Sequence, residues 1–548
     1  MTRDPSAASG SAAAVDPAAA APAAGGSAVT DPAVTDPAAV ADLRARRDKI
    51  RNEMGGLARV EALHASGLST VRDRIGRLLD PGSFTEIGTF SESARPEDKG
   101  STPGDGKVGG HGLISGQVVT VAGDDVTVKR GSSSLVGSRK LHRLFDQALA
   151  GGNPIVYLGE TGGARIPDTI GAIGHTSLNS FPDYTLRQRR IPLVTVIVGP
   201  SFGGSSLISA MSDFVVQIRG TCLSVTSPRV IEIATGEQAT MEEIGGVDVH
   251  LKITGQIDVA ADDEEQAFAY VRQFLGYLPP NAWTRPPRSA PRPPKDGPGL
   301  AGVVPERRSR AYDMHQVIDR LVDDGEYLEL KPRYGRSVIT ALTRIDGYPV
   351  GIVASQPMFE AGSVGPEACE KLCQFLPLCD SFDIPLLFLH DTPGFLVGKQ
   401  VEHRGILQKA IRLQEALVLA TVPKISVVIR KSFGLAHQVL NGANMGADYI
   451  LAWPGAEIGF MDPKVGANVI HYPELAALDP AERAEVLAKR ASEVAAGTSP
   501  YDAAGVLNID EVIEPGETRQ RIAARLAQLQ GREPRPLSSR LLATWPTC

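Results

Sequence analysis

One stretch of the chain joins a buried-strand pattern to a glycine turn, and such a turn can do chemistry. Residues 191–204, IPLVTVIVGPSFGG, begin with a valine- and isoleucine-rich run typical of a strand buried on both faces. The run ends in Gly203-Gly204, and an apolar helical pattern follows. The start of a helix offers unpaired backbone N–H groups and a positive dipole end, which together can hold an oxyanion. A glycine pair after a strand is also a common tight turn, so both interpretations stay open for this motif alone.

The chain makes this pattern twice, at a constant offset. Four pairs of landmarks lie 231 residues apart: Pro154 and Pro385, Thr161 and Thr392, Pro192 and Pro423, Gly203 and Gly434. One duplication of so long a period predicts two similar lobes rather than a solenoid of short repeats. Each lobe is therefore predicted to carry two strand-to-glycine turns.

The elements that must position these turns follow from periodicity and capping residues. Helices are expected over 41–64, over 70–79 with Ser69 as the N-cap, and over 138–150, with a helical tail from Pro480. Strands are expected around 109–110, 118–121, 126–131 and 449–452. The strand at 126–131 enters a Ser/Gly loop, which is either a plain connection or a phosphate cradle made by Lys129, Arg130, Arg139 and Lys140.

A chain of 548 residues is too long for one core, and its composition suggests where it divides. Residues 1–38 are rich in Ala and Pro and cannot bury enough apolar surface to become ordered, so they are predicted to be a disordered tail. The tail lacks the pattern of a secretory or transit peptide. We expect one lobe over 39–282, a proline-rich linker over 283–300, and a second lobe over 301–548.

Composition also argues against several kinds of partner. The net charge of −7 argues against nucleic acid and anionic membrane surfaces. The longest apolar runs fall well short of the ~18 residues that a membrane span needs. The five cysteines have no metal-type spacing, so they are interpreted as core thiols of a cytoplasmic protein, and no metal site is expected.

From about Ala41 onward the chain resembles the carboxyltransferase (beta) subunit of biotin-dependent acyl-CoA carboxylases. The resemblance is carried, in order, by TVRDRIGRLLDPGSF, GGARIPD, GPSFGGSSLISAMSDF, TGEQATMEEIGG, YDMHQVIDRLVDDGEYLE, VASQPM, DTPGFLVGKQVEHRGI, TVPKISVVIRKSFG, GADYILAWPGAEI and IDEVIEPGETR. It implies an α/β fold of two tandem crotonase-like ββα-spiral domains, usually assembled as a hexameric ring.

The resemblance also implies a reaction. In this family carboxybiotin on a partner protein lies beside an acyl-CoA, releases CO2, and leaves a biotin oxyanion that takes the proton alpha to the thioester. The CoA enolate then attacks CO2, so the enzyme must stabilise two oxyanions, and backbone N–H donors suit both. The chain has no Met-Lys biotinylation site and no ATP-binding glycine loop with its lysine. The biotin carboxylase and biotin carboxyl carrier functions are therefore expected on a partner (alpha) subunit.

Site residues are carried over from the family motif by motif. The oxyanion residues implied on the CoA side are Ala164, Gly203 and Gly204, and those on the biotin side are Gly394, Gly434, Leu435 and Ala436. The residues implied to contact the cofactors are Arg130, Gly131, Gly163, Arg165 and Phe395. His437 and Gln438 are implied to line the substrate pocket.

The second-lobe turn departs from the family pattern. The family has Gly-Gly-Ala-Tyr-Asp where this chain has GLAHQ at 434–438. Leu435 can still offer its N–H, but not at positive φ without strain. His437 is either an acid–base group or a packed histidine at a helix start. Gln438 stands where the family tunes its acyl pocket, so neither acetyl-CoA nor propionyl-CoA is assigned as the substrate.

Two other functions compete with the carboxylase. A decarboxylase subunit would run the same chemistry in reverse, and a non-catalytic beta-like scaffold would have lost the second oxyanion site through Leu435 and His437. The retained GGAR turn in the first lobe and TPGF turn in the second favour an active enzyme.

Overall fold

The computed structural model describes residues 36–172, 174, 187–297, 299–300, 302–533 and 535–546. The chain divides into two compact units, residues 1–47 and 48–548, and both sheets described below belong to the second unit. Most of the predicted tail, 1–35, lies outside the described residues. Helix α1 begins at Pro37, so the last residues of the predicted tail are helical.

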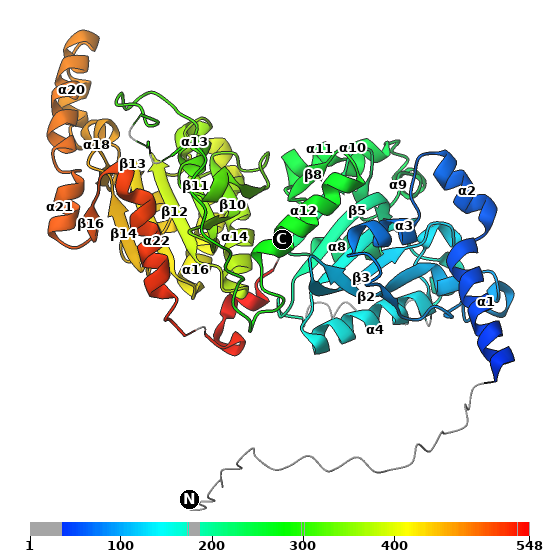
Figure 1. Cartoon of the computed structure of the whole chain (residues 1–548). Coiled ribbons are helices and arrows are strands. Elements are labelled where there is room, and N and C mark those ends of the chain that lie inside the picture. Colours follow the sequence, from blue (N-terminus) through cyan, green and yellow to red (C-terminus); the bar gives the residue numbers. More distant parts are fainter. Residues whose placement is uncertain are drawn as a thin grey trace, which may run out of the picture. The chain divides into compact units, whose positions relative to one another are not determined.

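The first lobe is built on an eight-stranded mixed sheet of order β1-β2-β3-β4-β5-β6-β8, with β7 paired to β5 (Figure 1). β1, β2 and β3 pair antiparallel, and β3 through β8 pair parallel. The strands are β1 (Thr85–Glu86), β2 (Lys107–Ile114), β3 (Gln117–Asp124), β4 (Ile155–Thr161), β5 (Leu193–Phe202), β6 (Phe214–Ile218), β7 (Leu223–Ser224) and β8 (Val259–Ala261).

The second lobe repeats this sheet. Its order is β16-β14-β13-β12-β11-β10-β9, with β15 paired to β13. The strands are β9 (Tyr327–Leu330), β10 (Val338–Ile345), β11 (Tyr348–Ser355), β12 (Leu386–Thr392), β13 (Lys424–Phe433), β14 (Tyr449–Ala452), β15 (Glu457–Gly459) and β16 (Glu511–Val512). Two similar mixed sheets in tandem agree with the duplicated α/β architecture that the resemblance implied.

Helices connect and cover the strands of both lobes (Figure 1). In the first lobe the described helices are α1 (Pro37–Glu53), α2 (Leu57–Ala65), α3 (Val71–Leu78), α4 (Leu135–Gly151), α5 (Ile166–Thr169), α8 (Gly204–Ala210), α9 (Pro228–Thr235), α10 (Met241–Gly245), α11 (Val247–Val249) and α12 (Glu264–Tyr277). In the second they are α13 (His315–Asp319), α14 (Pro366–Ser381), α15 (Lys399–His403), α16 (Ile406–Leu419), α17 (Gly434–Val439), α18 (Pro463–Ile470), α19 (Tyr472–Ala476), α20 (Pro480–Ala495), α21 (Pro500–Gly505) and α22 (Thr518–Leu529).

The duplication extends to the register of individual strands. Thr161 of β4 is opposite Ser201 of β5, and Thr392 of β12 is opposite Ser432 of β13, with a register shift just before each pair. An isolated bridge joins Ser133 to Ala164 in the first lobe, and its counterpart joins Val364 to Phe395 in the second. The offset of 231 residues read from the sequence therefore maps one lobe onto the other at these turns.

Several expected elements differ in detail. The expected helix over 41–64 is broken between α1 and α2, because Gly56 has φ 123° and the N–H of Gly55 bonds the Thr127 hydroxyl at 2.9 Å. The N-cap of α3 is Thr70, not Ser69, because Thr70 and Asp73 form a reciprocal capping box. The strand expected over 126–131 is a turn followed by a 3-10 helix, since Lys129 and Arg130 are both left-handed.

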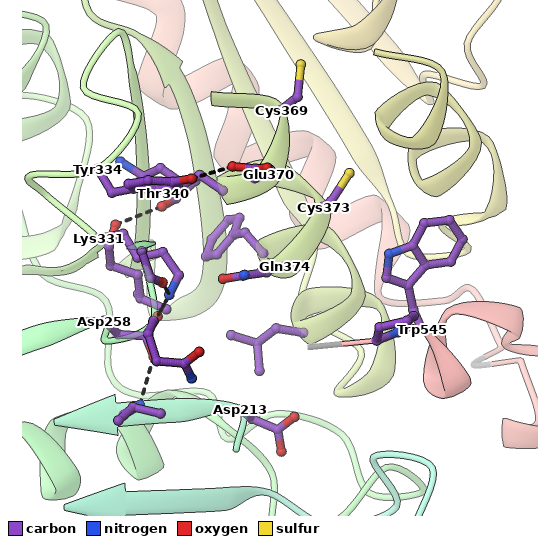
Figure 2. A pocket seen from close by; sticks show the side chains of 18 of the residues that line it. Asp213, Asp258, Lys331, Tyr334, Thr340, Cys369, Glu370, Cys373, Gln374 and Trp545 are labelled. Atoms are coloured by element: carbon purple, nitrogen blue, oxygen red, sulfur yellow. Dashed lines mark hydrogen bonds and ion pairs between the residues drawn. The ribbon is translucent and has the colours of Figure 1, made fainter. Parts of the chain in front are cut away.

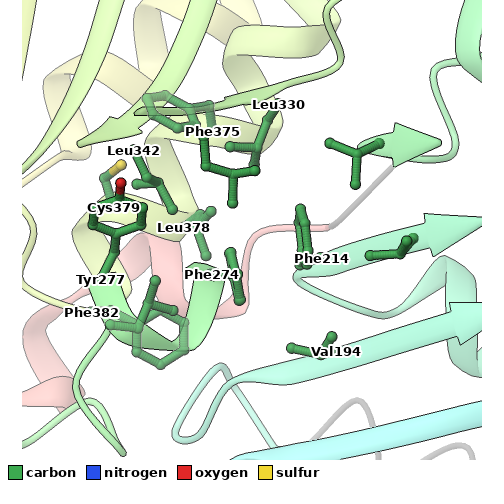
Figure 3. Packing of buried hydrophobic residues seen from close by; sticks show 14 of the residues in the cluster. Val194, Phe214, Phe274, Tyr277, Leu330, Leu342, Phe375, Leu378, Cys379 and Phe382 are labelled. Carbon is green, nitrogen blue, oxygen red and sulfur yellow. The ribbon is translucent and has the colours of Figure 1, made fainter. Parts of the chain in front are cut away.

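One hydrophobic core spans both lobes. The rings of Phe214 in β6 and Phe274 in α12 stack with their centroids 4.4 Å apart. Both belong to the same buried cluster as Phe375 of α14 and Phe382, which follows that helix (Figure 3). Such aromatic side chains bury large apolar areas and dominate the packing energy of a core. The lobe boundaries predicted at 282 and 301 remain predictions, because this shared core joins the lobes within one compact unit.

The C-terminal segment adds a polar link between the lobes. Arg189 of the first lobe donates to the carbonyl oxygens of Leu542 and Trp545, at 3.2 and 2.6 Å. Arg540 donates to the carbonyl oxygen of Ser381 at the end of α14, at 2.8 Å. Among the described residues, no helix is long and apolar enough to cross a membrane.

Candidate active site

In the first lobe two glycine turns lie next to each other at the ends of parallel strands. Gly203 follows β5 with φ 62° and ψ −123°, a conformation that favours glycine. A Cβ on Gly203 would lie 3.7 Å from Cα of Gly163 and 4.0 Å from the nitrogen of Ala164. A side chain at this position would therefore fill the space beside the Ala164 N–H.

Two backbone donors at this point have no partner. The N–H groups of Ala164 and Gly204 make no hydrogen bond to any described part of the chain. The neighbouring donors are used, because Gly203 donates to the carbonyl of Val225 at 3.1 Å and Gly163 donates to the Thr161 hydroxyl at 3.2 Å. Ala164 and Gly204 thus keep unpaired donors of the kind that can bind an oxyanion.

A short network holds the Ala164 turn in place. The N–H of Ser133 donates to the carbonyl of Gly163, and the N–H of Arg165 donates to the carbonyl of Ser133, both at 2.8 Å. The Thr161 hydroxyl donates to the carbonyl of Gly131 at 2.9 Å. These contacts orient the turn without using the Ala164 N–H, which leaves that group preorganised for a ligand.

The second lobe repeats the arrangement with different side chains. Val364 donates to the carbonyl of Gly394 at 3.1 Å, and Gly394 donates to the Thr392 hydroxyl at 3.3 Å. In the described chain the N–H groups of Phe395, Leu435 and Ala436 have no hydrogen-bond partner. By the repeat, Phe395 corresponds to Ala164 and Leu435 to Gly204.

Leu435 carries no backbone strain. The positive φ of this turn, 61°, belongs to Gly434, as it belongs to Gly203 in the first lobe. Leu435 lies within helix α17, and its side chain is 37% exposed beside the turn. The leucine therefore keeps its N–H unpaired in the described chain and places a partly exposed apolar side chain next to the turn.

His437 belongs to a hydrogen-bonded chain beneath this turn. The N–H of Ala443 donates to Nε2 of His437 at 3.3 Å, so Nδ1 of His437 carries the proton and donates to the Ser432 hydroxyl at 2.8 Å. The same hydroxyl lies 3.0 Å from Nδ1 of the buried His390. Burial lowers the pKa of His437 to about 4 and that of His390 to about 3, the second helped by His437. Both rings are therefore neutral links at neutral pH.

We expect His437→Gln to lower kcat/KM by less than about tenfold, because the ring contacts Ser432 and Ala443 rather than the free donors.

Below pH ~6.5 the unfolded chain binds a proton at this histidine, whereas the folded chain binds one only near pH 4. The free energy of unfolding should therefore fall as the pH is lowered from ~6.5 to ~4, and less steeply in the variant. Steady-state kinetics and urea titrations at several pH values measure both effects. A loss of about a thousandfold would instead make His437 an acid or base.

The predicted cofactor residues have different surroundings. Arg130 is exposed, and its carbonyl accepts the N–H of Gly162 at 3.0 Å. A Cβ on Gly162 would lie 3.8 Å from Cδ of Arg130, so the aliphatic part of this side chain lies beside the first-lobe turn. Arg165 is buried and pairs with Asp105 at 2.6 Å, so its contact with coenzyme A stays a prediction. A Cβ on Gly131 would lie 2.7 Å from the Glu160 carbonyl, which indicates a packing requirement. Gln438 is exposed on α17, three residues after Leu435.

The oxyanion role of Gly394 and the cofactor contact of Phe395 remain predictions. In the structure the N–H of Gly394 donates to the Thr392 hydroxyl, whereas that of Phe395 has no partner in the described chain. The repeat offset of 231 residues identifies Phe395 as the equivalent of Ala164 and could therefore have predicted its unpaired N–H. His390 and Ser432, which support the turn, were missed because nothing in their local sequence marks them. Among the described residues, no group of His, Cys, Asp or Glu could hold a metal ion.

Comparison with known proteins assigns the family. The model of the carboxyl transferase domain matches residues 62–540. The chain belongs to the carboxyl transferase domain family. Of the curated relatives of this carboxyltransferase, the propionyl-CoA carboxylase carboxyltransferase subunit of Haloferax mediterranei is 36% identical, over 90% of this chain and 96% of that one. The methylmalonyl-CoA decarboxylase subunit alpha of Propionigenium modestum is 34% identical, over 90% and 96%.

A solved structure matches the carboxyltransferase equally well. The crystal structure of transcarboxylase 12S, described as a hexamer assembly with methylmalonyl-coenzyme A and methylmalonic acid bound, has a TM-score of 0.85 and 36% identity. The alignment covers 92% of this chain and 98% of that one. The fold and the family of the carboxyltransferase are thus established together.

Proposed function

We propose that this carboxyltransferase moves CO2 from carboxybiotin, carried by a partner subunit, to the alpha carbon of an acyl-CoA. The observation that supports the proposal is the pair of unengaged N–H groups at equivalent turns of both lobes, Ala164 with Gly204 and Phe395 with Leu435. Two oxyanions develop in this reaction, one on the thioester and one on the biotin ureido group, and two donor pairs suit them.

The residues present fit both groups. In the first lobe the space that a Cβ on Gly203 would fill, beside Ala164, is left open. Arg130 is exposed next to this turn and can hold a phosphate of coenzyme A. In the second lobe the half-buried Phe395 offers an apolar wall beside its own N–H. We therefore assign the first lobe to acyl-CoA and the second to biotin.

When bound, carboxybiotin supplies the CO2. The N–H groups of Ala164 and Gly204 hold the thioester oxygen while negative charge builds on it. Those of Phe395 and Leu435 hold the ureido oxygen. Backbone donors carry no charge and do not titrate, so they act at any pH at which the fold is intact. No side chain of this protein has to act as the base.

The decarboxylase alternative uses the same donors in the opposite direction, and the similarity to the decarboxylase subunit of Propionigenium modestum keeps it open. The scaffold alternative loses its support, because Leu435 is unstrained and keeps its N–H free. Fixation of labelled bicarbonate across a panel of acyl-CoAs, with a matched biotin-carrying subunit, tests the proposal. Decarboxylation of the carboxylated acyl-CoAs without fixation would favour the alternative, and neither activity would overturn both.

The acyl preference should depend on Leu435 and Gln438, which lie on one face of α17 three residues apart. Leu435 adds apolar area near the reacting carbons, and Gln438 removes the family's acidic charge. The double variant Leu435→Gly with Gln438→Asp should shift kcat/KM toward acetyl-CoA or propionyl-CoA by about one to two orders of magnitude. An unchanged profile across the same panel would show that neither position lines the acyl site.

We also expect a dimer at minimum and a hexamer as the full assembly. Exposed apolar side chains lie close to both turns: Ile166 at 60%, Ile170 at 81% and Val225 at 77% in the first lobe, Val397 at 84% and Phe460 at 86% in the second. Exposed apolar groups gathered around a site mark an interface. Light scattering should give a multiple of the monomer mass, and a stable, active monomer would contradict this.

A further inference from the structure

A cavity of about 520 Å³ opens between the lobes, with Asp213 and Asp258 of the first lobe and Lys331 of the second among its lining residues (Figure 2). Its first-lobe wall includes Asp213, whose N–H bonds the carbonyl of Leu193 at the start of β5. The Gly203 turn follows the other end of the same strand. The cavity therefore lies near the opposite end of β5 from the Gly203 turn. Its volume is within the range of small-molecule sites.

Most buried charges around the cavity are paired. Arg189 lies 3.1 Å from Asp213, and Lys331 lies 3.2 Å from Asp258, across the lobe boundary. At the more exposed side, Lys409 lies 2.7 Å from Glu370. These pairs neutralise one another and add little net charge to the cavity.

Lys371 is the exception. It lines the cavity from α14, is 1% exposed, and its ammonium group donates to one acceptor, the carbonyl of Val338, at 2.7 Å. In the described chain no carboxylate lies within 4.0 Å of the ammonium group, and two of its N–H donors have no acceptor. Glu329 attracts this charge from farther away, and Lys331 opposes that attraction. Burial lowers the pKa of this ammonium to about 8. A buried charge of this kind is costly unless an anion pairs with it.

One part of the wall is apolar, whereas the remainder is polar, with Ser212, Thr254, Gln256, Thr340 and Gln374 beside the charged residues. Leu330, Phe375, Leu378, Cys373 and Trp545 line the cavity together with Lys371. A ligand that satisfies both features carries one negative charge and a hydrocarbon part. A dianion such as a phosphate ester is disfavoured, because Asp258 and Glu370 border the same space.

We propose that this interlobe cavity binds an amphipathic monocarboxylate, of the size of a medium-chain fatty acid, with its carboxylate on Lys371. The hydrocarbon part packs against Phe375, Leu378 and Trp545. No residue of the two donor turns lines the cavity, so the proposal stands or falls independently of the carboxyltransferase reaction.

Trp545 supplies a probe within the site. Titration of the full-length protein with octanoate should change its tryptophan fluorescence saturably, with a dissociation constant below about 1 mM, and calorimetry should give the same constant. Lys371→Met should weaken octanoate binding at least about tenfold, and octan-1-ol should bind wild type correspondingly weakly. The matched control is Lys424→Met, because Lys424 is also buried and donates only to carbonyls, at 3.0 and 3.1 Å, but lies outside the cavity. This control should bind octanoate as wild type does.

A second variant keeps the cavity assignment testable if Lys371→Met fails to fold. Cys373→Phe keeps the ammonium group but fills the cavity from α14, and it should also abolish binding. Circular dichroism and the thermal midpoint verify that each variant is folded. Equal affinity for octanoate and octan-1-ol, or full binding by a folded Lys371→Met protein, would overturn the assignment of the carboxylate to Lys371. Absence of saturable binding to wild type would overturn the site.

Discussion

Gly204→Pro is expected to lower kcat/KM by roughly 100- to 1,000-fold, the usual cost of removing one oxyanion donor. Gly204 is the first residue of α8, a position where proline is tolerated because its N–H has no partner within the helix. The substitution removes one hydrogen from one donor and leaves the helix intact. Malonyl- or methylmalonyl-CoA decarboxylation in the presence of free biotin measures the effect without a partner subunit.

Gly204→Ala is the matched control. It keeps the N–H, and its Cβ would lie 3.6 Å from the Ser133 hydroxyl oxygen, an ordinary contact. We expect a loss of less than about tenfold for alanine. If alanine and proline cost the same, the effect is steric and Gly204 is not an oxyanion donor.

Leu435→Pro should cause a loss of similar size, roughly 100- to 1,000-fold, in the second lobe. Leu435 is the second residue of α17, and its unpaired N–H can be removed there without breaking a helical hydrogen bond. Leu435→Ala keeps the donor and removes only apolar volume, so it should chiefly change the acyl preference. Full activity of the proline variant would exclude Leu435 as a donor.

Mixing the two proline variants tests how the lobes pair. If each site joins the first lobe of one protomer to the second lobe of another, a mixed dimer contains one intact site and one doubly defective site. Random reassembly should then restore about a quarter of wild-type activity. If both lobes of one protomer formed a single site, every site would carry a defect and no activity would return.

Local sequence predicted the parts of the fold that depend on local physics. The valine- and isoleucine-rich runs became the buried strands β5 and β13, and Tyr449–Ala452 became β14 at the expected residues. The break at Gly56 and the cap at Thr70 were misjudged, because each depends on a contact with Thr127 or Asp73 that competes with helical periodicity. Such contacts form only in the folded chain, where segments that are distant in the sequence or side chains on the same turn come within hydrogen-bonding distance.

The sequence by itself determined the duplication, the positions of the glycine turns and, through the resemblance, the family. The sequence does not reveal which backbone N–H groups remain unpaired. This depends on which neighbouring N–H groups donate to the acceptors of Val225, Thr161 and Thr392 in the folded chain. Tertiary structure decided this, placed the positive φ at Gly434 rather than at Leu435, and turned His437 inward to Ser432. It also created the interlobe cavity around Lys371, for which helix α14 had to pack against the first lobe. The physical reason is the same in each case, since a hydrogen-bond partner or a neighbouring charge is set by proximity in space and not by spacing along the chain.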